Sequence, residues 1–280
     1  MAESLKPGTL YVVATPIGNM SDLSARARLC LASADVVACE DTRKTGALLA
    51  RAGIKRQGRL FSYRDANEAR QAPGLVAKLG EGQSVVLVSD AGTPAISDPG
   101  FRLVRLAAQS GLEVVAVPGP SALTALLSVC GLATDRFSFE GFLAPSGSKR
   151  HRAIEDMKGA GRTYILYESP RRIVRLLGEL CELLDDPEVA VGRELTKMHE
   201  QVLRGRASEV AARLDNPRGE FAVAVYCEGH EQTLGGQVLE AEVERLLDQG
   251  LSVRDVAARL KPRGAPRREV YAAARALGRR

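Results

Sequence analysis

The hydrophobic and polar positions of the chain alternate in two different ways, and the change between them divides the sequence. Over the first 118 residues, each short apolar β-rich run is followed by a stretch with helical periodicity. The clearest run is Ser84–Ser89 (SVVLVS), and similar runs occupy 9–15, 35–39, 59–63 and 113–117. Strands that alternate with helices predict a mainly parallel sheet with helices on both faces.

The helices of this first region are predicted from their end signals. Ser21 is expected to cap a helix that runs to about residue 32, and Gly53 is expected to end a helix that begins at Thr42. Two further helices are predicted over 67–79 and directly after Gly100.

From residue 119 onward, strand-like runs follow one another with fewer helices between them, which predicts a mixed sheet. Strands are expected at 136–142, 163–167, 188–194, 200–204 and 220–227, and helices at 121–130, 146–158, 170–184 and 207–215. Residues 229–236 (GHEQTLGG) are typical of a linker, and 237–249 and 252–280 are predicted helical with a break around Pro262–Pro266. The pattern therefore predicts two α/β domains, 1–118 and 119–228, and a basic helical extension, 237–280.

The net charge of +5 is unevenly distributed along the chain. Residues 146–175 carry eight basic and three acidic side chains, and residues 251–280 carry nine and two. These two stretches indicate an anionic partner. An alternative is that they form a solvated helical face and an arginine-rich tail.

The residue types exclude several other classes of protein. The five cysteines are widely spaced with no CxxC, and the three histidines are scattered, so no metal site is evident and a reducing compartment is expected. No apolar run approaches the roughly 20 residues that span a bilayer, and the N-terminus has no apolar signal segment. We expect a soluble cytoplasmic protein with no membrane partner.

Three loops that follow predicted strands are the candidates for ligand binding, because open α/β sheets bind ligands beyond the carboxyl ends of their strands. They are 16–19, 90–100 and 118–122, and each contains Gly or Pro. The dinucleotide motif GxGxxG and the phosphate-binding motif GxxxxGK[ST] are both absent. An alternative for the 90–100 loop is a tight turn in which Asp90 and Asp98 only cap helices.

Six motifs in consistent order make the chain resemble one known family. They are ATPIGN (14–19), SDAGTPAISDPG (89–100), VPGPSA (117–122), YESP (167–170), RELTKMHE (193–200) and GEFAVAV (219–225). Together they resemble bacterial enzymes that methylate a cytidine 2′-hydroxyl in small-subunit ribosomal RNA, a branch of the tetrapyrrole methylase superfamily. The C-terminal KPRGAPRREVYAAA (261–274) is similar to the basic helical tail of that branch.

The resemblance implies two α/β domains with S-adenosylmethionine (SAM) in the cleft between them, a homodimer, and small-subunit ribosomal RNA as partner. The implied SAM-binding residues lie in the loops already singled out and in the second domain: Pro16, Asp90, Ala91, Gly92, Ile96, Ser121, Ala122, Glu168 and Ala222. The loop Pro16–Asn19 departs from the Gly-rich first loop of the porphyrinoid enzymes, and this departure favours the RNA branch.

Methyl transfer to a hydroxyl needs a group that removes the hydroxyl proton or stabilises the resulting charge. Two charged segments offer such groups, CEDTRKT (39–45) and RELTKMHE (193–200). We predict that five of their residues line the cleft near SAM: Glu40, Asp41, Arg43, Arg193 and Lys197. Glu194, His199 and Glu200 are further candidates, and the alternatives are a capped helix start at Asp41 and a charged strand edge at 193–200.

Three functions therefore remain open at the level of sequence. The first is 2′-O-methylation of a cytidine in small-subunit ribosomal RNA, with the basic stretches 146–152 and 171–175 and Lys261, Arg263, Arg267 and Arg268 on RNA phosphates. The second is SAM-dependent methylation of a porphyrinoid. The third is a non-catalytic RNA-binding or ribosome assembly factor that has kept the fold.

Overall fold

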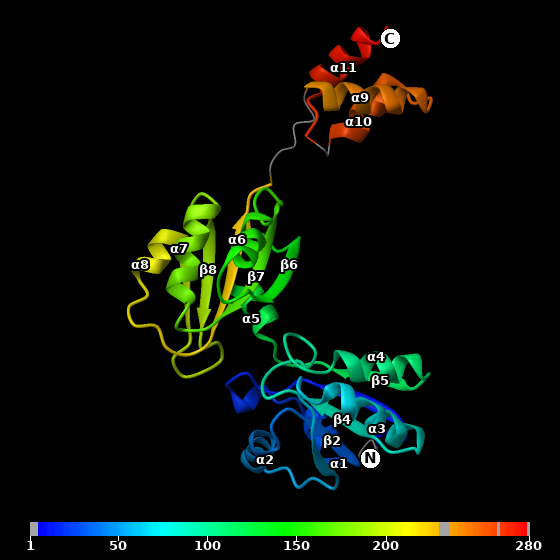
Figure 1. Ribbon diagram of the computed structural model, residues 1–280, viewed down its shortest axis with the longest axis vertical. Helices are drawn as coiled ribbons and strands as arrows, with labels where there is room; N and C mark the ends of the chain where they lie inside the picture. The colour runs from blue at the N-terminus through cyan, green and yellow to red at the C-terminus, as the bar shows by residue number, and fades with distance from the viewer. Residues whose placement is uncertain (1–4, 230–235, 262–263, 279–280) are drawn as a thin grey trace.

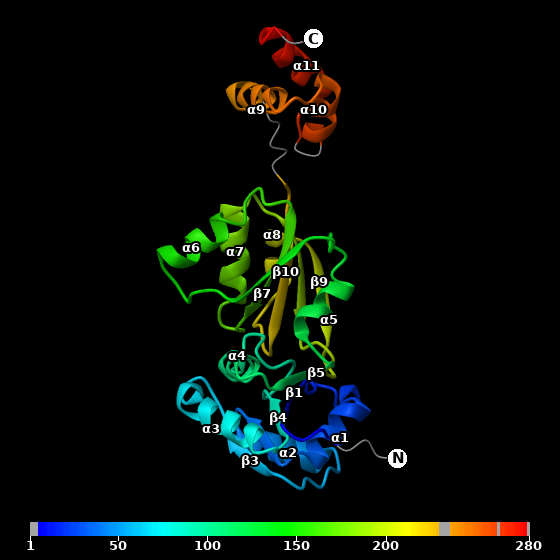
Figure 2. The same cartoon turned by 90° about the vertical axis from the view of Figure 1, so that its right-hand side faces the viewer.

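A computed structural model describes residues 5–229, 236–261 and 264–278 of the chain. Two sheets with their helices stack along the long axis, and three C-terminal helices stand apart from them (Figures 1 and 2). In this described part of the chain, none of the helices has the length and apolar character that spanning a bilayer requires.

The first sheet contains five parallel strands in the order β3-β2-β4-β1-β5, which confirms the predicted parallel arrangement. Its strands are β1 (Thr9–Val13), β2 (Val36–Cys39), β3 (Arg59–Ser62), β4 (Val85–Val88) and β5 (Glu113–Val117). The helices between them are α1 (Ala25–Ser33), α2 (Thr42–Arg51), α3 (Glu68–Gly80) and α4 (Phe101–Gln109).

Both faces of this sheet are covered, which explains why β4 is apolar at every position. Val86 and Val88 belong to the cluster that contains Leu31 of α1. Val85 and Leu87 belong to the opposite cluster, which contains residues of α3 and α4. Successive strand residues point to opposite faces, so a strand covered on both sides has no polar position.

The predicted helix cap at Ser21 is wrong. Asn19 caps a short 3₁₀ turn, η1 (Met20–Asp22), by accepting a hydrogen bond from the Ser21 amide. Ser21 therefore lies inside that turn, and Ser24 caps α1 instead, with its hydroxyl oxygen 3.1 Å from the Ala27 amide nitrogen. The structure also does not support the alternative in which Asp98 caps a helix, because α4 begins after Gly100 without a side-chain cap.

The second sheet is mixed, as predicted, with the strand order β6-β7-β10-β8-β9. Only β6 (Phe137–Phe142) and β7 (Arg162–Glu168) are parallel. The other strands pair antiparallel: β8 (Glu188–Arg193), β9 (Gln201–Arg206) and β10 (Phe221–Cys227).

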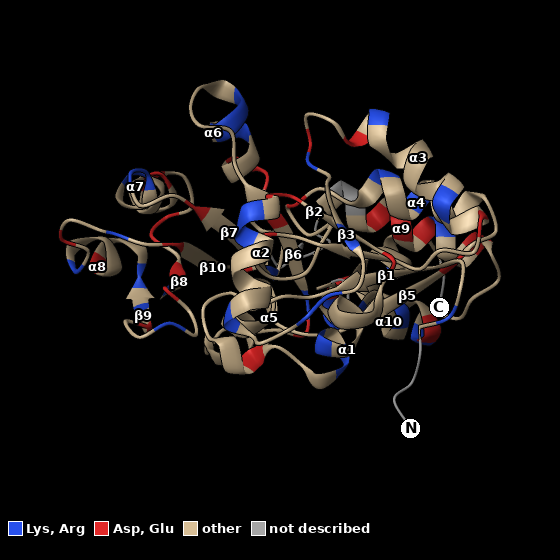
Figure 3. Ribbon diagram, turned by 90° about the horizontal axis from the view of Figure 1, so that it is seen from below, with Lys and Arg blue, Asp and Glu red and all other residues tan. Residues whose placement is uncertain are grey.

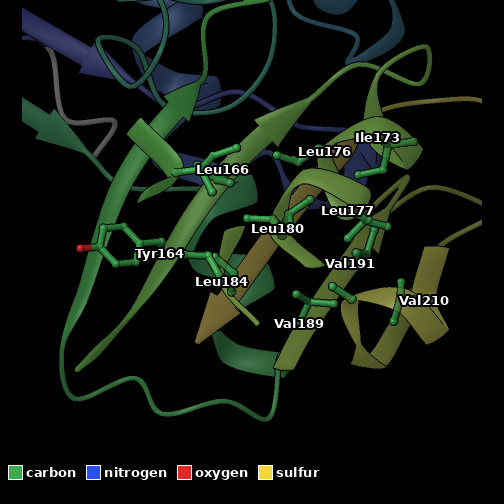
Figure 4. Packing of buried hydrophobic residues seen from close by; sticks show 14 of the residues in the cluster. Tyr164, Leu166, Ile173, Leu176, Leu177, Leu180, Leu184, Val189, Val191 and Val210 are labelled. Carbon is green, nitrogen blue, oxygen red and sulfur yellow. The ribbon is translucent and has the colours of Figure 1, made fainter. Parts of the chain in front are cut away.

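Helices cover both faces of this sheet as well. The cluster in Figure 4 joins its strands to α6 (Ser148–Glu155), α7 (Ile173–Leu183) and α8 (Ala207–Ala212). Against the other face lies α5 (Ala122–Val129), whose Leu126 packs with Ile165 and Ala224. Ile17, from the loop after β1, joins this second cluster. The first loop therefore packs against the second sheet.

The C-terminal helices form one small core of their own. They are α9 (Gly236–Asp248), α10 (Val253–Leu260) and α11 (Arg267–Ala276). Val243, Val256 and Val270, one from each helix, share a buried cluster. The predicted break falls between α10 and α11, where Pro262 and Arg263 lie outside the described residues, as do 230–235 of the expected linker.

Candidate active site

The three candidate loops come together at one edge of the first sheet. Thr15 and Gly92 exchange two backbone hydrogen bonds, with N···O distances of 2.9 and 3.0 Å, which join the first loop to the second. The Thr93 hydroxyl donates to the Pro120 carbonyl oxygen at 3.1 Å, which joins the second loop to the third. These contacts follow from the parallel sheet, because β1, β4 and β5 are neighbours and all end at this edge.

A cleft of about 390 Å³ lies where these loops meet the second sheet. Its lining is mostly small or apolar and comes from both halves of the molecule. The first half contributes Ile17, Ala91, Gly92, Thr93, Ile96, Ser97 and Asp98, and the α5 end contributes Ser121 and Ala122. The second half contributes Phe142, Tyr167, Glu168, Ser169, Pro170, Gly192, Leu195, Gly219, Glu220, Phe221 and Ala222.

Most of the residues expected to bind a cofactor lie in this lining: Ala91, Gly92, Ile96, Ser121, Ala122, Glu168 and Ala222. Pro16 and Asp90 do not, although their neighbours Ile17 and Ala91 do. The Asp90 carboxylate faces α2, where it accepts a hydrogen bond from the Asp41 amide at 3.1 Å and pairs with Lys44 at 2.7 Å.

Glu168 lines the cleft, but its carboxylate is fully engaged by protein groups. Oε2 lies 3.1 Å from Nη1 of Arg150, and Oε1 lies 2.8 Å from Nε of Arg172 and 2.8 Å from the Ser169 amide. The side chains of Glu168 and Arg150 are 1% and 0% exposed. This ion pair fixes the end of β7 at the edge of the cleft.

Glu40, Asp41 and Arg43 lie beside the cleft and not in its lining. Asp41 caps α2, as the structural alternative held, and also pairs with Arg43 at 3.0 Å. The hydrogen bonds from Arg43 lower the pKa of Asp41 to about 2. Partial burial, followed by the negative charge of Asp90, raises the pKa of Glu40.

Arg193 and Lys197 flank the cleft on the other side and are likewise outside its lining. Arg193 donates from Nε to the Arg218 carbonyl oxygen at 2.8 Å. Lys197 pairs with Glu194 at 2.8 Å and with Glu220, a lining residue, at 3.0 Å. Burial alone would raise the pKa of Glu194, but hydrogen bonds from Lys197 and from the Glu220 amide hold it below its ordinary value.

His199 and Glu200 lie at the exposed end of the same loop. Glu200 accepts a hydrogen bond from the Thr196 amide at 2.7 Å, so it stabilises the loop's own backbone. Neither residue is in the cleft lining.

The basic stretches divide into buried and exposed residues. Arg150 is completely buried, and Arg172 and Arg175 pair with Glu168 and Glu179. Lys149, Arg152 and Arg171 remain exposed, and α6 carries part of this basic surface (Figure 3). Of the C-terminal group, Lys261, Arg267 and Arg268 are exposed, and Arg263 lies outside the described residues.

Asp98 and Tyr167 are among the lining residues that the sequence does not identify as candidates for chemistry. In the sequence, Asp98 is part of the 89–100 motif and a possible helix cap, and Tyr167 is part of the 167–170 motif. Burial raises the pKa of both side chains, that of Asp98 to about 6. The signal that could have identified Asp98 is its place in the loop after β4, eight residues beyond Asp90.

Three comparisons with known proteins agree with this architecture. The family model described as Tetrapyrrole (Corrin/Porphyrin) Methylases matches residues 9–211. A protein of Mesorhizobium japonicum named ribosomal RNA small subunit methyltransferase I is 45% identical over 88% of this chain and 82% of its own length. A Synechocystis protein of the same name is 40% identical over 94% of this chain and 96% of its own.

A solved structure of a cobalamin biosynthetic enzyme, cobalt precorrin-4 methyltransferase, has a similar fold. It superposes with a TM-score of 0.57 over 78% of this chain and 95% of its own, at 18% identity. At this identity the likeness concerns the fold alone.

Proposed function

The chain belongs to the Tetrapyrrole (Corrin/Porphyrin) Methylases, and we propose that it methylates the 2′-hydroxyl of a cytidine in small-subunit ribosomal RNA. It is a SAM-dependent methyltransferase of that family. The observation that carries the RNA substrate is the 40–45% identity, over most of the chain, to proteins named ribosomal RNA small subunit methyltransferase I. The 2′-hydroxyl and the cytidine rest on the six motifs and the Pro16–Asn19 loop.

The cleft fits SAM in its size and in the chemistry of its lining. Ala91, Gly92 and Ala222 present backbone groups close to the space, because their side chains are small. We propose that SAM is held by the lining residues and that Pro16 and Asp90 support the loops that carry them.

The two charged clusters beside the cleft are proposed to act on the RNA. Glu40, Asp41 and Arg43 lie on one side, and Arg193 and Lys197 on the other. Arg43 pairs with Asp41, but its side chain is 90% exposed, so its guanidinium is available to a phosphate. A second open hollow, formed by 170–171, 174 and 216–219, shares Pro170 and Gly219 with the cleft and adds Arg171 and Arg218. The basic side chains at these positions can contact the phosphates of an RNA strand that crosses the mouth of the cleft.

We also propose the organisation in which this reaction takes place. The functional units are 1–118, 119–228 and 237–280, and the active form is a homodimer. Sedimentation velocity of the full chain would reveal a second copy, and a concentration-independent monomer would contradict the dimer.

The direct test is methyl transfer from labelled SAM to small ribosomal subunits that lack this modification. We expect one labelled cytidine whose 3′ phosphodiester bond resists alkaline hydrolysis, because alkaline cleavage needs a free 2′-hydroxyl. Label on a base, or none on RNA with transfer to a porphyrinoid, would instead support the second function. SAM that does not bind even at millimolar concentration would support a non-catalytic factor.

The C-terminal helices are predicted to contribute RNA affinity and not SAM affinity. Because α9–α11 share a core separate from both sheets, a chain ending at Glu228 should bind SAM within about twofold of the intact chain. Its RNA affinity should fall at least about tenfold at low salt, since phosphate contacts are lost. Isothermal titration calorimetry measures the SAM affinity, and filter binding measures the RNA affinity.

A triple substitution in the C-terminal helices tests whether their positive charge contributes to RNA affinity while the helices themselves are kept. Lys261, Arg267 and Arg268 are exposed, so replacing all three by Gln should leave the helices intact. The slope of log K against log salt should become shallower by up to about 3. Unchanged RNA affinity in both variants would contradict a role for this unit.

A further inference from the structure

Three carboxylates line the cleft, and two of them are neutralised by cations. Glu168 is held by Arg150 and Arg172, and Glu220 pairs with Lys197 at 3.0 Å. Asp98 differs from both, because among the described residues no Lys, Arg or His nitrogen lies within 4 Å of its carboxylate. It is therefore the lining carboxylate that is free to accept a proton from a bound molecule.

The backbone around Asp98 is held in an unusual conformation. Ala95 and Ser97 both adopt left-handed φ angles, 66° and 61°, although neither is glycine. Such conformations are costly for residues with a Cβ, and they cluster at functional sites. At the end of β4, the Ser89 hydroxyl donates to the carbonyl oxygens of Ala91 and Gly92, at 3.2 and 3.4 Å, which holds the start of this loop in place. The loop thus holds Asp98 against the cleft instead of letting it extend into solvent.

The surroundings of Asp98 give its carboxyl group a higher pKa than that of an exposed aspartate. Burial, followed by the negative charges of Glu40, Asp90 and Asp65, raises its pKa to about 6, and the nearby Ser89 hydroxyl opposes this rise. Tyr167 faces it from β7. Lys44 on α2 is paired with Asp90 at 2.7 Å. A general base works best when its pKa lies near the working pH.

We propose that the Asp98 carboxylate is the general base that accepts the proton of the methylated hydroxyl, an inference that rests on the proposed function. SAM, when bound, supplies an electrophilic methyl group, and the bond from methyl carbon to sulfur breaks with its electron pair left on sulfur as the new C–O bond forms. The hydroxyl O–H bond breaks in the same reaction, and its proton moves to a carboxylate oxygen of Asp98. The proton is later released to solvent through the open side of the cleft.

The test compares Asp98→Asn with the intact enzyme on small ribosomal subunits and on SAM alone. We expect the methylation rate constant to fall about 10²–10⁴-fold, with SAM affinity within threefold. The rate of the intact enzyme should rise with pH through about 6 and then level, and this rise should vanish in D98N.

Thermal stability gives a readout that does not depend on activity. Since folding raises the pKa of Asp98, its ionised form destabilises the fold above about pH 6, and this penalty disappears as pH falls toward the unfolded value. D98N should therefore melt higher than the intact enzyme at pH 8, and the difference should shrink at pH 5. A merely structural aspartate would give a lower melting temperature in D98N at both pH values.

Asp65→Asn is the matched control, since Asp65 is an exposed acid near Asp98 that lies outside the cleft lining. D65N should keep the plateau rate and shift the acidic limb to lower pH. The proposal is overturned if D98N keeps the turnover of the intact enzyme or keeps its fall in rate at acidic pH. It is also overturned if D98N melts at a lower temperature and no longer binds SAM. Failure of the proposed function is a separate result, because it shows in the intact enzyme as methylation of a base or as no transfer to RNA.

Discussion

Replacement of Arg150 by methionine is expected to lower the free energy of unfolding of the second sheet and its helices by about 3–5 kcal/mol. Arg150 is fully buried, and its Nε lies 2.5 Å from Oε2 of Glu179 while its Nη1 lies 3.1 Å from Oε2 of Glu168. Methionine keeps most of the volume but removes the charge. Both carboxylates would then stay buried with one cation fewer each, which is the costly situation for an ion pair.

Urea unfolding followed by circular dichroism measures this effect, because the chain has no tryptophan for fluorescence. Arg175→Met is the matched control: Arg175 also pairs with Glu179, but 48% of its side chain is exposed, so we expect a loss below about 1 kcal/mol. Adding Glu179→Gln to the Arg150 variant should recover part of the loss. Equal urea midpoints for R150M and R175M would contradict the buried network.

Arg150 also shows where reasoning from the sequence stops. It stands in SGSKRHR, where four neighbouring basic or titratable side chains look equivalent, and the stretch was expected to follow RNA phosphates. The helix phase distinguishes them, because Arg150 shares a buried face with Ile154 and Met157, four and seven residues later. Only the packed structure shows that Arg150 pairs on that face with Glu168 and Glu179.

The fold was predictable to a much greater extent than the side-chain directions. The VVLV run of β4 and the strand–helix alternation fix a parallel sheet, and a parallel sheet brings the three loops to one edge. Within the 90–100 loop, however, the sequence offers two equivalent aspartates. Asp90 pairs with Lys44, whereas Asp98 lines the cleft. The left-handed φ angles of Ala95 and Ser97, just before Asp98, have no signal in the residue types.

Gly18 carries the second large prediction, because it lies where the first loop meets the second domain. A Cβ at this position would lie 2.3 Å from Cγ of Lys197 and 2.9 Å from Oγ1 of Thr196. The next residue, Asn19, donates its amide hydrogen to the same Thr196 oxygen at 3.2 Å. Gly18 is thus required for close approach of the two loops, and its neighbour Ile17 lines the cleft.

Gly18→Ala is expected to weaken SAM binding about 5- to 150-fold, since overpacking typically costs about 1–3 kcal/mol and the two sides of the cleft must separate to relieve it. Isothermal titration calorimetry measures the change. Gly46→Ala is the control, because a Cβ there meets nothing within 4 Å and alanine favours the α2 helix. Adding Lys197→Ala to G18A removes the Cγ that clashes most and should restore part of the affinity. If G18A bound SAM as tightly as G46A, the contact between these loops would not determine the geometry of the cleft.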